Sequence, residues 1–226
     1  MYWDSTIIIL IPAIIFSIVA QIMVKSAFSK YSKVRNSRGL TGADAAREIL
    51  DRNGLTNVRI EHISGSLTDH YDPKANVIRL SDDVYGSATV AAVGVAAHEA
   101  GHAVQYAEGY YPIKIRNAII PVTRFGSSLS TPLVILGLAL SWDFLITAGI
   151  LLFCAVVLFQ AITLPVEFNA SGRALKTLRS SHFLEDDEMK GARSVLTAAA
   201  MTYVAAMLSA LLSLVRLLVI SGRRRR

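Results

Sequence analysis

The sequence predicts a mainly α-helical membrane protein, with about four transmembrane helices and one small α+β domain. Of its 226 residues, 53% are hydrophobic and only 18% are charged, which is more apolar than an ordinary soluble chain. Several long apolar runs also alternate with polar stretches along the sequence. Membrane spans and one water-exposed domain of modest size both fit within this length.

The first apolar run, residues 6–24, has about 19 residues, enough to cross a bilayer core of ~30 Å. Asp4 precedes the run, and five basic residues follow it over residues 25–38. The positive-inside rule therefore predicts an external N-terminus and a cytoplasmic segment after the run. A cleaved signal peptide fits less well, because its basic residues would come before the run. We expect residues 1–25 to form the N-terminal transmembrane helix.

Residues 26–116 are predicted to form the cytoplasmic α+β region. Thr41 is a candidate N-cap for a short helix over residues 45–53. Three strands are expected over residues 58–63, 66–71 and 76–80, the last two joined by a turn. Such a sheet either presents an edge to which an extended peptide can add, or only packs on a helix. The sequence does not decide between these two roles.

The pattern H-E-x-x-H follows the predicted sheet, at His98, Glu99 and His102. The surrounding residues 88–107 lack proline and are rich in alanine and valine, which favours a helix. Its candidate N-cap residues are Ser81, Asp82, Asp83 and Ser87. Residues four apart lie on one helix face, so both imidazoles can reach one metal ion. Glu99 is rotated from His98 by about 100°, which places its carboxylate beside the open position of that metal.

This arrangement is typical of metalloproteases. Zinc held by two imidazoles and one further protein ligand lowers the pKa of a bound water to about 7. Glu99 can then take the proton of that water and later pass it to a leaving amine. The single cysteine, Cys154, lies in an apolar run, so the metal must use histidine and carboxylate ligands. The competing interpretation is an ordinary buried helix with two satisfied histidines.

Residues 117–165 are predicted to form a tight transmembrane hairpin, with Trp142 between its arms at the far interface. Small residues in its first arm, among them Gly126, Ser130 and Gly137, permit close helix packing. The segments expected after it are a helix and charged loop over 166–194, a C-terminal transmembrane helix over 195–222 and a basic tail over 223–226. Four crossings place that tail outside the cell, against the positive-inside tendency.

A third metal ligand is needed, and the sequence offers several candidates. They are His62, His70, Glu108, Glu167, His182 and the acids of residues 185–188. We favour Glu167, which begins a helical stretch of small residues. If the hairpin crosses the membrane twice, Glu167 also returns to the side of His98 and His102. The alternative is an interfacial acid paired with Arg173 or Lys176.

Three segments together resemble a known family: LTDHYDP at 67–73, HEAGHA at 98–103 and LPVEFNAS at 164–171. They are similar to the YugP-like membrane neutral zinc metallopeptidases, and the likeness spans nearly the whole chain. The resemblance implies a zincin-like domain of gluzincin type, with zinc ligands His98, His102 and Glu167 and catalytic Glu99. The order of the segments also resembles that of the HtpX-type membrane proteases.

The sequence departs from these families at one place. Where they usually carry an aspartate two or four residues after the glutamate, this chain has Asn169 and Ser171. An aspartate there could orient a zinc-bound histidine. Asn169 can accept a hydrogen bond without bearing charge, so we expect a metal site of weaker affinity rather than no site.

The predicted function is that of a membrane-embedded zinc endopeptidase with one Zn²⁺ per chain. It would hydrolyse membrane or unfolded proteins at the cytoplasmic face of a prokaryotic plasma membrane, with Glu99 as general base on zinc-bound water. His70, His182 and Tyr203 are candidates for the donor that stabilises the oxyanion. The alternative is a catalytically weak membrane scaffold or binding protein on a metalloprotease fold. A zinc transporter is disfavoured, because the region before the metal-site helix is too polar for a membrane core.

The expected partners are the lipid bilayer and a protein or peptide substrate. The net charge of +6 comes from basic residues clustered beside apolar segments, which indicates membrane orientation and not nucleic-acid binding. A homo-oligomer is compatible with the sequence.

Overall fold

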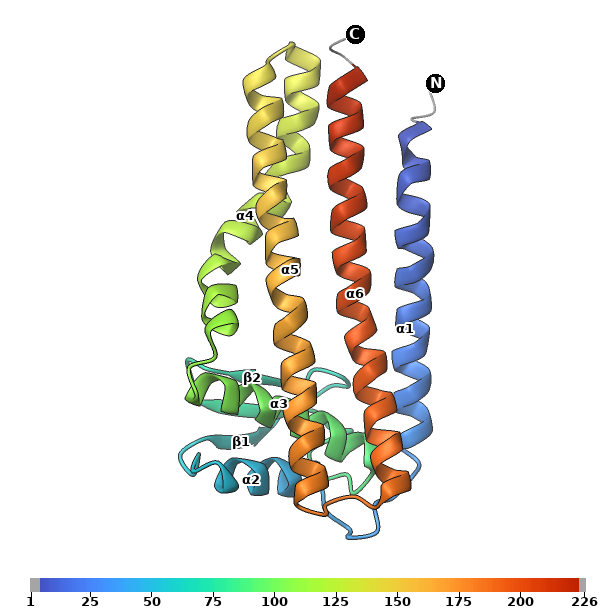
Figure 1. Ribbon diagram of the computed structural model, residues 1–226, viewed down its shortest axis with the longest axis vertical. Coiled ribbons are helices and arrows are strands. Elements are labelled where there is room, and N and C mark those ends of the chain that lie inside the picture. The colour runs from blue at the N-terminus through green and yellow to red at the C-terminus, as the bar shows by residue number, and fades with distance from the viewer. Residues whose placement is uncertain (1–4, 224–226) are drawn as a thin grey trace. The chain divides into compact units, whose positions relative to one another are not determined.

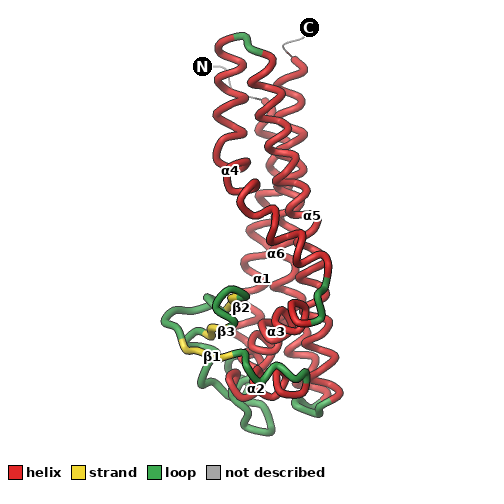
Figure 2. The backbone as a smooth tube through the Cα atoms, turned by 90° about the vertical axis from the view of Figure 1, so that its left-hand side faces the viewer, coloured by secondary structure: helices red, strands yellow, loops and turns green. Residues whose placement is uncertain are grey.

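The computed structural model describes residues 5–223 and is mainly helical, with one small sheet (Figures 1 and 2). Its helices are η1 (Ser5–Leu10), α1 (Ile11–Tyr31), α2 (Gly42–Arg52), α3 (Val90–Ala107), α4 (Tyr111–Leu140), α5 (Asp143–Ser180) and α6 (Asp186–Arg223). Its strands are β1 (Arg59–His62), β2 (His70–Asp72) and β3 (Val77–Leu80). The mainly helical class with a small sheet is as predicted, while most of the predicted basic tail lies outside the described residues.

Within residues 5–223, four helical segments are long and apolar enough to cross a membrane, by length and composition: η1 with α1, α4, α5 and α6. All four are longer than the sequence indicated. Helix α4 continues through Pro121 and Pro132, and α5 continues through Pro165, where a boundary was expected. A proline removes one backbone donor and favours a kink, but a helix packed along its length can continue past it.

The chain divides into two compact units, which we describe separately. The helical unit comprises Met1–Gln21, Pro112–Pro165 and Thr202–Arg226. The mixed unit comprises Ile22–Tyr111 and Val166–Met201, and it contains the sheet, α2 and α3.

Within the helical unit, α4 and α5 form a hairpin with close backbone contacts. A Cβ atom at Gly126 would lie 2.8 Å from the Leu152 carbonyl oxygen, and one at Gly149 would lie 2.7 Å from that of Ser130. Only glycine permits this approach, which agrees with the expectation of close packing through small residues. The turn places Ser141 in the left-handed region, with a φ of 65°, and leaves Trp142 exposed.

Within the mixed unit, the sheet has the strand order β1-β3-β2, so β2 lies at one edge. Strand β1 runs parallel to β3, whereas β2 pairs antiparallel to it, with Tyr71 opposite Ile78. The turn between β2 and β3 is held by Asp72, whose Oδ1 accepts hydrogen bonds from the amides of Lys74 and Ala75. The inner face of β3 is fully buried, as expected for a strand packed against helices.

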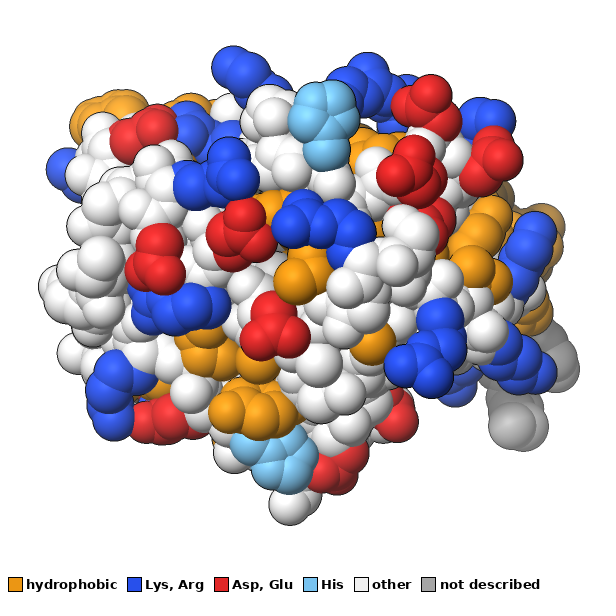
Figure 3. Space-filling model, turned by 90° about the horizontal axis from the view of Figure 1, so that it is seen from below, with side chains coloured by type: hydrophobic (Ala, Val, Ile, Leu, Met, Phe, Trp, Pro, Cys, Tyr) orange, Lys and Arg blue, Asp and Glu red, His pale blue; other side chains and the backbone are white. Residues whose placement is uncertain are grey.

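Helix α3 is the centre of the mixed unit and is buried on nearly all sides. Its N-cap is Thr89 and not Ser87, because the Thr89 hydroxyl accepts the Ala92 amide. Helix α2 packs against it and begins with the capping box of Thr41 and Asp44. Figure 2 shows the strands beside α3. The face in Figure 3 carries acidic and basic side chains close together, as is typical of a water-exposed surface.

Candidate metal centre

Helix α3 presents His98 and His102 one turn apart on the same face. Their ring centroids are 4.7 Å apart, and the two side chains are 15% and 11% exposed. Each imidazole therefore keeps access to a small volume while most of its surface is packed. This is the arrangement that the four-residue spacing predicts for a helix.

Helix α5 brings Glu167 to the two histidines. Its Oε2 atom lies 3.3 Å from Nε2 of His98 and 3.4 Å from Nε2 of His102, and the residue is only 2% exposed. Among the described residues, these form the one group of three or more His, Cys, Asp or Glu side chains whose ligand atoms lie within 4.8 Å of one another. The geometry therefore joins two elements far apart in the sequence.

The distances in this group fit a zinc ion. In a tetrahedral site with bonds of about 2.0–2.1 Å, neighbouring ligand atoms lie about 3.3–3.4 Å apart. The two nitrogen–oxygen distances in the structure equal this spacing. Two histidines and one glutamate are also a known ligand set of catalytic zinc, one that leaves a fourth position open.

Gly101 makes the close approach of α5 to α3 feasible. A Cβ atom at this position would lie 2.7 Å from the carbonyl oxygen of Ala170 on α5. Any larger residue would push the two helices apart, and Glu167 lies one helical turn before Ala170. The glycine inside the HEAGH stretch therefore sets the distance between the histidines and the glutamate.

The second nitrogen of each imidazole has a hydrogen-bond partner. Nδ1 of His98 lies 3.1 Å from the Ser171 hydroxyl, and Nδ1 of His102 lies 3.0 Å from Oε1 of Gln105. Sequence reasoning did not single out Gln105. The available signal was its position three residues after His102, on the same face of the helix.

Glu99 lies beside the two histidines on α3 and is 8% exposed. Its Oε2 atom accepts a hydrogen bond of 3.0 Å from the backbone amide of Tyr71 on the edge strand β2. This contact holds the carboxylate in one orientation without neutralising it. Strand β2 therefore lies against the same part of α3 as the candidate metal ligands.

The charges of this region favour a bound cation. Burial alone would lower the pKa of His102, but the hydrogen bond to Glu167 and the charges of Glu99 and Glu167 outweigh it and raise that pKa. Burial also raises the pKa of Asp69 despite hydrogen bonds from Ser81, and the negative charge of Glu99 adds to the rise. The carboxylates of Glu99 and Glu167 thus favour a positive charge beside them, which either a proton on His102 or a bound cation supplies.

Asn169 does not accept a hydrogen bond from either histidine in the structure. Its Oδ1 atom instead accepts from Nε2 of Gln105 at 2.9 Å and from Nε of Arg173 at 2.7 Å. The residue expected to orient a zinc-bound histidine directly is thus separated from His102 by Gln105.

The other predicted site residues are not members of this group. His70 is exposed on β2, where its ring contacts the Thr68 carbonyl oxygen and Arg79. His182 is exposed in the turn after α5, with a φ of 49°. Tyr203 belongs to α6 within the helical unit. Two further third-ligand candidates have other partners, since His62 pairs with Asp82 and Glu108 with Arg173.

The fold and this group of residues define a helix-rich protein with membrane-length helices and a candidate zinc centre. Residues 6–222 match the family described as "Putative neutral zinc metallopeptidase". The chain is also 49% identical over 214 residues to "Putative membrane protease YugP" of Bacillus subtilis (strain 168), with 95% of each chain covered. The chain therefore belongs to the neutral zinc metallopeptidase family, which confirms the resemblance seen in the sequence. No solved structure matches it significantly.

Proposed function

We propose that the chain is a zinc-dependent membrane endopeptidase that cleaves membrane or unfolded proteins at the cytoplasmic membrane surface. The main support is the convergence of His98, His102 and Glu167, with the carboxylate of Glu99 beside them. The membership of a zinc metallopeptidase family supports the same chemistry.

In this proposal, Nε2 of His98, Nε2 of His102 and Oε2 of Glu167 hold one zinc ion per chain. When bound, zinc supplies a Lewis acid that polarises the scissile carbonyl and acidifies a water molecule. The two imidazoles and the carboxylate would hold the ion in a fixed position, because all three side chains are largely buried.

Glu99 acts as the general base and then as the general acid. One of its oxygens is held by the Tyr71 amide, and no hydrogen bond to the other oxygen occurs among the described residues. That second oxygen can take a proton from the attacking water and later deliver it to the leaving amine. Partial exclusion of solvent favours these transfers, because it strengthens electrostatic interactions around the carboxylate.

The edge strand β2 is the proposed binding surface for an extended substrate segment. Strand β2 pairs with β3 along one edge, and no described strand pairs with its other edge. Residues of β2 also contact the metal-site helix α3. A peptide that adds to such an edge by backbone hydrogen bonds is recognised with little dependence on its side chains. This mode suits a protease whose substrates are unfolded or membrane-inserted segments.

The proposed location is the prokaryotic plasma membrane, with the mixed unit in the cytoplasm. Four helices of membrane length support insertion, and the relative from Bacillus subtilis is named as a membrane protease. The basic residues that follow the first apolar run support the orientation.

Cleavage of an unfolded casein-like protein by the purified full chain in detergent tests the proposal. The wild type should cleave it, and Glu99→Gln should bind the same amount of zinc without cleaving. Cleavage by Glu99→Gln at the wild-type rate would contradict the role of Glu99. Zinc binding without cleavage of casein or of a membrane-inserted substrate by the wild type would favour the scaffold alternative.

A further inference from the structure

We propose that Arg173, Asn169 and Gln105 form a hydrogen-bond chain of fixed direction that keeps a proton on Nδ1 of His102 and a free lone pair on its Nε2. This inference rests on the proposed zinc function, and it assigns positioning roles to residues that do not touch the metal. Gln105 is the central member, because it alone of the three contacts the histidine.

Gln105 is completely buried on α3 and uses its whole amide group. Its Nε2 atom donates to the Val166 carbonyl oxygen and to Oδ1 of Asn169, at 2.9 Å each. Its Oε1 atom lies 3.0 Å from Nδ1 of His102. Both amide hydrogens therefore have acceptors, and the oxygen faces the imidazole.

These contacts fix the orientation of the Gln105 amide. The Val166 carbonyl oxygen can only accept, so the NH₂ group of Gln105 must face it. The reverse orientation would place Oε1 of Gln105 against that carbonyl oxygen in a buried site, which leaves two acceptors without a donor. With Oε1 facing His102, the hydrogen bond requires a proton on Nδ1. In the neutral imidazole, the form that binds a metal, the lone pair is then on Nε2, the atom that faces Glu167.

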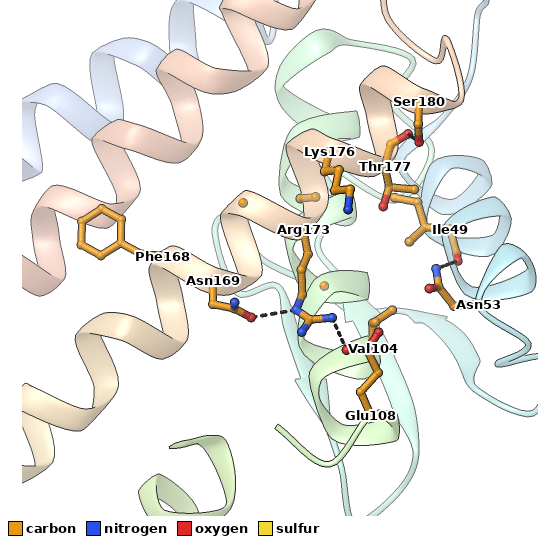
Figure 4. A pocket seen from close by; sticks show the side chains of 13 residues that line it. Ile49, Asn53, Val104, Glu108, Phe168, Asn169, Arg173, Lys176, Thr177 and Ser180 are labelled. Carbon is orange, nitrogen blue, oxygen red and sulfur yellow. Dashed lines mark hydrogen bonds and ion pairs between the residues drawn. The ribbon is translucent and has the colours of Figure 1, made fainter. Parts of the chain in front are cut away.

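Arg173 sets the direction one step further out. A guanidinium group has donors and no acceptor, so Nε of Arg173 requires the oxygen of Asn169 and not its nitrogen. The Asn169 oxygen is then shared with Gln105. Figure 4 shows Arg173 between Asn169 and Glu108, with contacts to both. The hydrogen-bond chain therefore runs from a surface ion pair at one end to the buried imidazole at the other.

The hydrogen-bond chain also explains why an asparagine is suitable at position 169. The geometry uses the Asn169 oxygen as an acceptor from Gln105 and Arg173, a role that needs no negative charge. His98 differs, because its Nδ1 atom faces the Ser171 hydroxyl, which can either donate or accept. Of the two candidate ligand histidines, only His102 has its protonation pattern imposed by its hydrogen-bond partner.

Zinc affinity of the full chain in detergent, measured by competition with a chelator, tests the role of Gln105. Gln105→Leu removes the acceptor at Nδ1 and should weaken zinc binding by about 10- to 100-fold, the usual effect of losing a partner of a metal-bound histidine. Gln105→Glu restores an acceptor there and should bind zinc more tightly than Gln105→Leu. A purely structural role predicts no such rescue, because the carboxylate is the poorer match for Val166 and Asn169. Thermal unfolding of each metal-free variant checks that it is folded.

Arg173→Met and Lys176→Met provide a matched pair that leaves the buried residues intact. Both side chains are basic, lie on α5 and line the same cavity, but only Arg173 contacts Asn169. Arg173→Met should weaken zinc binding by up to about tenfold, at the lower end of such effects. Lys176→Met should bind zinc as the wild type does.

The outcomes separate this inference from the proposed function. Wild-type zinc affinity in folded Gln105→Leu would overturn the hydrogen-bond chain and leave the zinc site standing. If Gln105→Leu does not fold, equal affinities in the two methionine variants would overturn it instead. A wild-type chain that binds no zinc would refute the proposed function and this inference together.

Discussion

The helical unit and the mixed unit are stabilised in different ways. The helical unit exposes many large apolar side chains, such as Ile8, Phe144 and Leu151, and its helices meet at glycines and small residues. Its contacts across the helices include single hydroxyl pairs such as Ser17 with Ser209. The mixed unit also buries carboxylates, namely Glu99 and Glu167, each of which has specific partners.

This difference predicts where the chain tolerates change. On the helical unit, an apolar replacement at an exposed position alters few contacts. In the mixed unit, removal of one polar group leaves another buried group without its partner, which costs about 1–3 kcal/mol for a neutral group. Both units share one sensitive feature, the close approach of helices at glycine. Replacing such a glycine with alanine in each unit therefore allows the effects on stability and zinc binding to be compared directly.

Gly101→Ala should have the largest effect, because it changes both stability and metal binding. The added Cβ would meet the Ala170 carbonyl oxygen at 2.7 Å, so α5 must move away from α3 and take Glu167 with it. We expect a loss of about 1–3 kcal/mol in unfolding free energy, together with weaker zinc binding. Gly172→Ala is the matched control, since nothing lies within 4 Å of its Cβ position. Unchanged zinc affinity in Gly101→Ala would contradict the role given to this contact.

Gly149→Ala should destabilise the helical unit to a similar degree and leave zinc binding unchanged. Its Cβ would lie 2.7 Å from the Ser130 carbonyl oxygen, which forces α4 and α5 apart. Thermal unfolding in detergent and zinc content measure the two effects separately. Leu151→Ala, at a position that is 64% exposed, should change neither quantity. Loss of zinc from folded Gly149→Ala would show that zinc binding in the mixed unit depends on helix packing in the helical unit.

Arg216→Leu should have a smaller effect, confined to the helical unit. Nε of Arg216 donates to the Thr6 hydroxyl at 3.1 Å, a contact between the last and the first helical segments. Side-chain hydrogen bonds between membrane helices contribute about 0.6 kcal/mol on average, so the melting temperature should fall slightly. A double-mutant cycle with Thr6→Val isolates this contact, and a coupling energy of zero would remove it from the account.

The smallest expected effect is an acid-dependent one in the mixed unit. The Gly65 amide and His62 lower the pKa of the exposed Asp82 carboxyl below its usual value. The ionised carboxylate therefore adds stability above its unfolded pKa of about 3.9, and this contribution is lost as the pH falls through the lower folded value. Asp82→Asn should melt below the wild type at pH 6, with the difference shrinking towards pH 3. Asp83→Asn, at the exposed neighbouring position, should leave the melting temperature at pH 6 unchanged.

The sequence predicted most local elements of the mixed unit, but the strand expected over 66–71 was misplaced: β2 covers only His70–Asp72 and includes Asp72, which was expected in the turn. The four-residue spacing of the histidines, the alternation in the strands and the Thr41 cap all depend on neighbours in the chain. The four apolar spans were also predicted, but not their full lengths. Pro165 was expected to end a helix, whereas the packed helix α5 continues through it.

The contacts between α3 and α5 were harder to foresee. Gln105 reads in the sequence as an ordinary polar residue, since its acceptors Val166 and Asn169 are more than 60 positions away. The same holds for Gly101, whose need for a missing Cβ depends on Ala170. Such features follow from how two helices meet, and no local pattern encodes them.

The most direct test of the account is the zinc content of the purified chain, measured by elemental analysis for the wild type, Glu167→Ala and Glu185→Ala. Glu185 is exposed and belongs to the charged segment that offered alternative third ligands. We expect about one zinc per chain in the wild type and in Glu185→Ala, and loss of the metal in folded Glu167→Ala. Zinc retained at full affinity by Glu167→Ala, or zinc lost from folded Glu185→Ala, would contradict the proposed ligand set.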